Sequence, residues 1–161
     1  MIENIKTLLT NKNKTISVAE SLTGGNLQAY FSSINGSSKF YLGGITAYNI
    51  DIKKKFFDID YEAAKKCDCV SEEVAITMAT SIANLMNSDY SISTTGFAVP
   101  NDTISVPYAY ICFYSKSNNI ISCEKVIQPF SMSRIDFQKY LVSYIASQFI
   151  KFFENLKDDH K

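Results

Sequence analysis

The chain has 161 residues, enough for one domain with a sizeable buried core. Sixteen basic residues balance sixteen acidic ones, so the composition gives no sign of DNA or another polyanion as a partner. The amino terminus carries an early acidic residue, and no apolar run approaches the roughly 20 residues of a membrane span. We therefore expect a single domain over residues 1–161 that works in the cytoplasm without a membrane or nucleic-acid partner.

The pattern of apolar residues predicts helices that alternate with strands. In chain order, these are a helix at 5–9, a strand at 15–19, a helix at 25–33, a strand at 45–48, a short helix at 53–57, a helix at 71–86, a strand at 89–95, a hairpin of strands at 106–114 and 120–127, and a helix from about 133 to 156. This alternation with a late hairpin is typical of a layered α/β fold with a mixed sheet.

The last predicted helix holds more large apolar residues than one core-facing stripe requires. Burial on two sides within one chain would explain this excess. A subunit interface is the second reading, because aromatic residues are enriched at interfaces. We expect a homo-oligomer on this basis.

The cysteines and the single histidine argue against a metal site. Cys67 and Cys69 flank an aspartate, whereas Cys112 and Cys123 lie in apolar, strand-like runs. A zinc site needs CxxC pairs or a paired histidine, and the only histidine, His160, stands in the last two residues, where we expect a solvated tail. We predict four free thiols, no metal ion and no Ser–His–Asp triad.

The segment Val18-Ala19-Glu20-Ser21-Leu22-Thr23-Gly24-Gly25 joins the first predicted strand to a helix. Free N–H groups at a helix start attract anions, and glycine lets a backbone approach a ligand closely. The alternative is that Ser21 or Thr23 simply caps the helix. Two further strands end in polar or small residues: Tyr48 and Lys53 follow the second, and Thr95 and Gly96 the third. Ligands of open α/β sheets bind at such carboxyl ends.

Taken in order, several segments resemble the CinA C-terminal domain family, the nicotinamide-nucleotide amidase or competence-damage-inducible family. The motifs are ESxTGG from Glu20, GSS from Gly36 and GGxxxY from Gly43 with a following lysine, together with Val70-Ser71-Glu72-Glu73-Val74 and Thr95-Gly96. The resemblance runs from about Thr15 to Arg134. It implies a three-layer α/β/α sandwich with a mostly parallel sheet, and hydrolysis of nicotinamide mononucleotide to nicotinic acid mononucleotide and ammonia.

The resemblance assigns Ser21 as the nucleophile and Lys53 as its base. Lysine can act as a base when burial lowers its pKa, and serine–lysine pairs are known. Tyr48 would orient Lys53 or relay the proton. The alternative for Lys53 is a solvated side chain in the run of lysines at 53–55. No cofactor is implied, because the reaction needs only water as co-substrate.

The resemblance also implies contacts to the substrate. The backbone of Thr23, Gly24 and Gly25 is the first choice for an anion cradle, with Ser37 and Ser38 as further contributors. Glu20 is expected to anchor the loop by hydrogen bonds, and Thr95 and Gly96 to line the pocket. Arg134 would bind phosphate in a bidentate way, unless it is merely an exposed arginine at a helix start.

The chain departs from the family pattern after Thr95. Val99 stands at a family glycine, Val106-Pro107-Tyr108 replaces Val-Gly-Thr, and Gln138 replaces a second arginine. Valine does not readily adopt a positive φ, so a loop that covers the substrate would be altered here. Two alternatives to the amidase therefore remain: a non-catalytic protein that binds a nucleotide or a partner on the same fold, and a hydrolase for another amide.

Overall fold

A computed structural model describes residues 1–158 of the chain, so His160 lies outside the described residues. Its strands form one five-stranded sheet in the order β2-β1-β3-β4-β5. The strands are β1 (Ile16–Glu20), β2 (Tyr41–Thr46), β3 (Tyr90–Phe97), β4 (Tyr108–Ser115) and β5 (Ile120–Ile127). β1 pairs in parallel with β2 and β3, whereas β4 is antiparallel to β3 and β5. The sheet is therefore mixed, and only β4 runs against the other strands.

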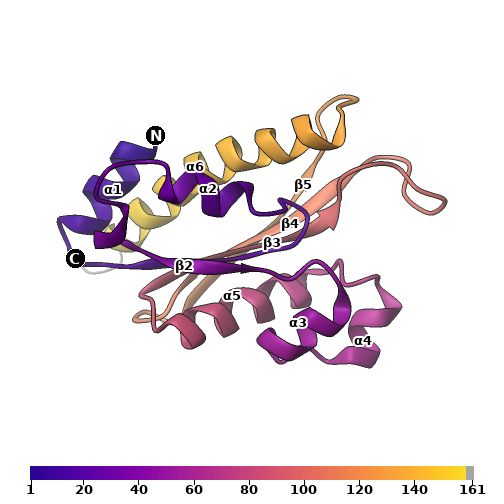
Figure 1. The fold of residues 1–161 in the computed structure, drawn as a ribbon, viewed down its shortest axis with the longest axis horizontal. Coiled ribbons are helices and arrows are strands. Elements are labelled where there is room, and N and C mark those ends of the chain that lie inside the picture. Colours follow the sequence, from indigo (N-terminus) through magenta and orange to yellow (C-terminus); the bar gives the residue numbers. More distant parts are fainter. Residues whose placement is uncertain (159–161) are drawn as a thin grey trace.

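Helices cover both faces of the sheet (Figure 1). One face carries α1 (Ile2–Thr10), α2 (Asn26–Ser32) and α6 (Arg134–Asp158), and the other carries α3 (Ile50–Phe57), α4 (Tyr61–Lys66) and α5 (Glu72–Met86). The largest buried cluster lies between α1, α2, α6 and the sheet, and two smaller clusters lie beneath α3 to α5. The predicted three-layer α/β/α sandwich is confirmed.

The predicted elements are present, with three differences. β2 begins at Tyr41 instead of Ile45, and it includes the pair Gly43-Gly44. A Cβ on Gly44 would lie 2.5 Å from Cγ2 of Val18, so this glycine lets β2 pack closely on β1. The prediction missed α4 and a 3₁₀ turn at Ser37–Lys39, both of only one or two turns. Asp60, whose side chain caps α4 by accepting from Ala63 N–H, is the signal that could have revealed α4.

The apolar excess of α6 is explained by burial within one chain. Its largest side chains are fully or almost fully buried against the sheet, α1 and α2; they are Phe137, Leu141, Ile145, Phe149 and Phe153. Burial within one chain therefore accounts for these five side chains, and the homo-oligomer stays a prediction. Although α6 has 25 residues, none of the helices in residues 1–158 is long and apolar enough to cross a membrane.

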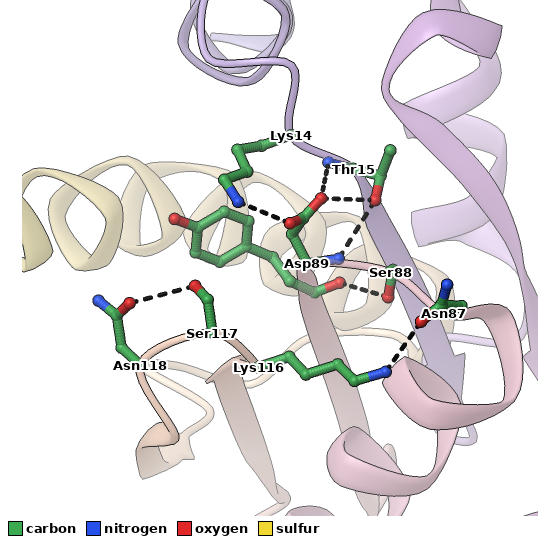
Figure 2. Close-up of polar contacts among 9 residues, drawn as sticks. Lys14, Thr15, Asn87, Ser88, Asp89, Lys116, Ser117 and Asn118 are labelled. Carbon is green, nitrogen blue, oxygen red and sulfur yellow. Dashed lines mark hydrogen bonds and ion pairs between the residues drawn. The ribbon is translucent and has the colours of Figure 1, made fainter.

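A cluster of polar contacts links neighbouring strands at the amino edge of the sheet, that is, at the N-terminal ends of the parallel strands (Figure 2). The Asp89 carboxylate accepts hydrogen bonds from Lys14 Nζ at 2.7 Å and from Thr15 N–H and Oγ1 at 2.9 Å. Across the same edge, Lys116 Nζ donates to the side-chain oxygen of Asn87 at 3.0 Å. These contacts join the start of β1, the start of β3 and the end of β4, at the end of the parallel strands opposite to Ser21.

Candidate active site

The loop after β1 places Ser21 at the carboxyl edge of the sheet. Glu20, the last residue of β1, is fully buried, and its carboxylate accepts hydrogen bonds from the N–H groups of Gly25, Leu27 and Gln28 at 3.1, 3.0 and 2.8 Å. A carboxylate at a helix N-terminus satisfies free N–H groups and suits the helix dipole. The expectation that Glu20 anchors the loop agrees with this geometry, and the loop holds Ser21 in a fixed position beside it.

The chain itself engages part of the predicted anion cradle. Gly24 and Gly25 have φ of +62° and +97°, which turns the chain so that the start of α2 faces Glu20. The Gly25 N–H binds Glu20, the Gly24 N–H donates to Ser21 C=O at 3.1 Å, and the Thr23 hydroxyl binds Thr94 at 2.7 Å. Two of the three backbone N–H groups of the predicted cradle, those of Gly24 and Gly25, therefore already have an acceptor, and an anion site here stays a prediction.

Lys53 reaches Ser21 from α3. The helix is capped by Asn49, whose side chain accepts from the Ile52 N–H, and Lys53 lies in its first turn on the buried face. The Lys53 ammonium nitrogen lies 2.8 Å from Ser21 Oγ, and the two side chains are 3% and 7% exposed. Burial lowers the pKa of Lys53, while the neighbouring Cys69 thiol acts weakly in the opposite direction. The reading of Lys53 as a solvated lysine is therefore wrong.

Tyr48 contacts Lys53 through its backbone and not through its ring. Its carbonyl oxygen accepts a long hydrogen bond of 3.4 Å from Lys53 Nζ. Its side chain is 63% exposed, and its hydroxyl accepts from Arg134 Nη1 at 3.3 Å. The expected orienting contact exists, but any residue could supply that carbonyl. The phenol faces Arg134, so this geometry gives no support to a proton relay through it.

The end of β3 forms another wall of the site. Thr95 and Gly96 line the pocket, but the Thr95 hydroxyl donates to Cys69 C=O at 2.6 Å instead of pointing to a ligand. A Cβ on Gly96 would lie 2.3 Å from Tyr108 C=O, so this glycine is required by the pairing of β3 with β4. Both residues act here by shaping the wall.

The first turns of α6 close the site from the other side of the sheet. Arg134 lines the pocket. Gln138, one turn later, donates from Nε2 to Leu22 C=O at 2.8 Å and so holds the loop that carries Ser21. The sequence marked Gln138 only as a departure from the family pattern. Its contact with a residue 116 positions earlier could not be read from spacing along the chain.

Ser37 and Ser38 do not belong to this site. They form the 3₁₀ turn that precedes β2, and β2 runs parallel to β1 with Tyr41 opposite Ile16 and Thr46 opposite Glu20. The residues just before β2 therefore lie at the amino edge of the sheet, whereas Ser21 lies at the carboxyl edge. The prediction that they bind the substrate from within this chain is wrong, because a parallel crossover returns the chain to the opposite edge.

The assembled residues surround a pocket of about 310 Å³, within the range of small-molecule sites. Its walls are Ser21, Leu22, Tyr48, Lys53, Asp68, Val70, residues 95–99, Asn101 and Arg134. Asp68 and Asn101 were missed, because no sequence motif marks them. Val99 lies in the wall without a positive φ, so the loop avoids the backbone strain that the substitution of glycine suggested.

A buried serine–lysine pair therefore lies at the carboxyl edge of this α/β sandwich, beside the pocket. The chain belongs to the CinA C-terminal domain family, whose model matches residues 1–150. It is 40% identical over 114 residues to a CinA-like protein of Prochlorococcus marinus, and 38% identical over 120 residues to one of Crocosphaera subtropica. These matches cover 70% and 73% of this chain but only 27% and 29% of those relatives, so the chain spans less than a third of their length.

Solved structures with the same fold come from the same superfamily. A CinA superfamily protein from Enterobacter cloacae has a TM-score of 0.86 at 21% identity, over 94% of this chain and 89% of that one. A competence/damage-inducible protein from Agrobacterium tumefaciens has a TM-score of 0.86 at 22% identity, over 93% and 92%. At this identity the likeness establishes the fold alone.

Proposed function

We propose that the chain is an amidohydrolase that converts nicotinamide mononucleotide to nicotinic acid mononucleotide and ammonia. The observation that carries the proposal is the contact of 2.8 Å between Lys53 Nζ and Ser21 Oγ at the pocket wall. A serine hydroxyl is a weak nucleophile until a base takes its proton. A lysine whose pKa is lowered by burial is such a base when it is neutral.

In the proposed reaction, Ser21 Oγ attacks the carboxamide carbon and Lys53 accepts the hydroxyl proton. Lys53 then returns that proton to the nitrogen, which leaves as ammonia while the acyl group stays on Ser21. A water molecule attacks the acyl-enzyme with Lys53 as base again, and this step releases the acid and restores the serine. Both steps use the same base, so the reaction needs no histidine.

The oxyanion of each step needs hydrogen-bond donors. The N–H of Leu22 directly follows the nucleophile and belongs to a pocket-lining residue; within residues 1–158 it has no hydrogen-bond acceptor. The N–H after the nucleophile is also an oxyanion donor in other serine hydrolases. Removal of one such donor in those enzymes costs about 10²–10³ in kcat. Leu22 is therefore our candidate for this role, and Gln138 fixes it from the carbonyl side.

The phosphate of the substrate has one evident partner, Arg134. Because the N–H groups at the start of α2 bind Glu20, Arg134 would carry the phosphate contact, and Asp68 and Asn101 lie near enough to line the remainder of the pocket. This sparse anion site is the observation that favours the second candidate, a hydrolase for an amide without a phosphate. The same observation is also compatible with the non-catalytic alternative, a protein that binds a nucleotide without turnover.

Ammonia release by the purified protein tests these candidates. Wild type, Ser21→Ala and Ser38→Ala are assayed with nicotinamide mononucleotide and with nicotinamide riboside, which lacks the phosphate. The proposal expects release from the mononucleotide that Ser21→Ala abolishes and Ser38→Ala retains, since Ser38 is exposed and lies at the other sheet edge. Equal rates on both substrates would favour another amide. Calorimetric binding without release by wild type would favour the non-catalytic protein.

We also propose, as a separate point, that the protein is a cytoplasmic homo-oligomer. Support comes from apolar side chains that are 51–67% exposed near the start of β4, the end of β5 and the start of α6, namely Val106, Ile127, Phe130 and Ile135. Light scattering after size-exclusion chromatography tests the oligomeric state, and a monomeric mass at micromolar concentration would contradict the homo-oligomer.

A further inference from the structure

Two cysteines face each other across the β4–β5 hairpin. Cys112 and Cys123 are directly opposite in the antiparallel register, which runs without irregularity from Tyr108 opposite Ile127 to Ser115 opposite Ile120. All four cysteines of the chain are free thiols. Cys112 is fully buried against Ala75 and Ala79 of α5, whereas Cys123 is partly exposed.

The hydrogen-bond pattern of the hairpin fixes how close the two residues are. The Gln128 N–H donates to Pro107 C=O at 2.9 Å, one step beyond the pair of Tyr108 and Ile127, so Pro107 and Gln128 form a hydrogen-bonded pair. Hydrogen-bonded and non-hydrogen-bonded pairs alternate along an antiparallel ladder. Counting from Pro107, Cys112 and Cys123 form a non-hydrogen-bonded pair, in which Cα atoms are about 4.5 Å apart and side chains approach most closely.

This separation fits a disulfide. Disulfides join Cα atoms about 4.4–6.8 Å apart, so the hairpin meets the requirement at its short end without movement of the strands. The neighbouring Cys123 thiol, together with burial, raises the pKa of the Cys112 thiol far above its usual value. The other cysteines are engaged elsewhere: Cys67 Sγ donates to Ala64 C=O at 3.4 Å, and Cys69 lies beside Lys53.

We propose that Cys112 and Cys123 form a redox site that a peroxide converts to an intramolecular disulfide. The Cys123 thiolate attacks the terminal peroxide oxygen, breaks the O–O bond and becomes a sulfenic acid, while the other oxygen takes up the proton that the thiol lost and leaves as an alcohol or water. The Cys112 sulfur then attacks the Cys123 sulfur, and its proton leaves with the hydroxyl as water. The peroxide gains the two electrons that the two thiols lose, and a dithiol such as dithiothreitol reverses the change by exchange.

The order of the two steps follows from exposure. Cys123 is the partly exposed member of the pair and meets the oxidant first, and Cys112 resolves it from inside the sheet. The bond would close a short loop around the turn at Lys116 to Asn119 and tie β4 to β5. Neither cysteine lines the pocket around Ser21, so this site is independent of the proposed hydrolysis.

Peptide mapping after peroxide treatment tests the proposal. Lys116 lies between the two cysteines, so trypsin separates their peptides unless a disulfide joins them. We expect the linked peptide pair in the oxidised wild type, its loss after dithiothreitol, and its persistence in the Cys67→Ser/Cys69→Ser variant. Absence of the pair, or a Cys123–Cys123 link between two chains, would overturn the proposal.

Two single variants separate the steps. In Cys112→Ser, dimedone should label Cys123 as a trapped sulfenic acid, whereas wild type should give little adduct. Oxidation should raise the thermal midpoint of wild type by roughly 5–10 °C, the range expected for a short cross-link in a domain of this size, and should leave Cys123→Ser unchanged. Equal dimedone labelling of wild type and Cys112→Ser would show that Cys112 does not resolve Cys123 and would refute the mechanism.

Discussion

The Lys53 amine and the Ser21 hydroxyl oxygen are 2.8 Å apart, although 32 positions separate them in the chain. β1 delivers the serine and α3 delivers the lysine, and the parallel pairing of β1 with β2 brings the ends of both strands to one edge. Both side chains are buried, so the pair is held away from bulk water. The pocket beside it is the one place in the described chain where these two groups and Arg134 meet.

Lys53→Met is expected to abolish turnover and to stabilise the fold. Burial lowers the pKa of Lys53, so the unfolded chain keeps a proton that the folded chain gives up. Lys53 therefore opposes folding below its ordinary pKa of about 10.4, and wild-type stability rises as the pH climbs from the folded pKa toward that value. Loss of the base should lower kcat by at least about 10²-fold, and unfolding in urea at neutral pH should show a gain of about 1–2 kcal/mol.

The pH dependence of activity is a second test of the Ser21–Lys53 pair, and a variant of an exposed lysine is its control. Activity of wild type should fall as the pH drops through the folded pKa of Lys53, because the protonated amine cannot accept the Ser21 proton. Lys55→Met, in the same helix but exposed, should leave both the pH profile and the stability close to wild type. A stability loss in Lys53→Met would contradict the argument from burial.

Tyr48→Phe should reduce kcat by less than about tenfold. The Lys53 amine contacts the Tyr48 carbonyl, which the substitution keeps, and the phenol oxygen accepts a hydrogen bond from Arg134. General acid–base partners typically contribute about 10²–10⁴-fold, so a proton relay through the phenol would give a much larger loss. Steady-state kinetics on the two proteins distinguishes these outcomes.

Glu20→Ala should destabilise the domain by about 3 kcal/mol or more. The buried carboxylate accepts from three N–H groups at the start of α2, and hydrogen bonds to a charged group are worth about 1.5–3 kcal/mol each. Urea unfolding measures the loss. Glu3→Ala is the matched control, because Glu3 forms an exposed ion pair with Lys6 at 3.4 Å, and such pairs contribute at most about 1 kcal/mol.

Gln138→Ala should lower kcat by about tenfold and change stability by only about 1 kcal/mol. Its Nε2 holds Leu22 C=O at 2.8 Å, and a shift of the nucleophile loop by even 1 Å is costly for catalysis. Lys139→Ala, exposed at the next position, should leave kcat unchanged. Equal kcat for wild type and Gln138→Ala would show that the loop holds its position without this contact.

Asp89→Asn should weaken the amino edge of the sheet shown in Figure 2. Although burial acts to raise the pKa of Asp89, the hydrogen bonds from Lys14 and Thr15 outweigh it, so the pKa is held below its usual value. A lowered carboxyl pKa stabilises the fold above the ordinary value of about 3.9 and loses that contribution as the pH falls. We expect Asp89→Asn to lower the free energy of unfolding by about 1–3 kcal/mol at pH 7. This difference from wild type should become smaller toward pH 3, and urea unfolding at both pH values measures it.

Much of the fold could be predicted because most elements have a recognisable residue pattern within their own segment of the sequence. The β-branched run before Ser21 and the apolar face after Ser71 are periodic over enough residues to be read from the sequence. The short helix α4 and the start of β2 could not be read in this way. The helix α4 is too short to show a period, and the start of β2 depends on the packing of Gly44 on Val18.

The sequence by itself determined which groups carry the proposed chemistry: Ser21 and Lys53 stand in motifs, the resemblance extends to Arg134, and all three line the same pocket. Only the tertiary structure decided which neighbours serve them. Glu20 takes the Gly25 N–H that a phosphate was expected to use, Ser37 and Ser38 lie at the far edge, and Gln138 reaches the loop from α6. A motif gives the identity and order of residues along the chain, but not their positions in space. The partners of an N–H, a carbonyl or a hydroxyl are set by distances between segments, which exist only once the chain has folded.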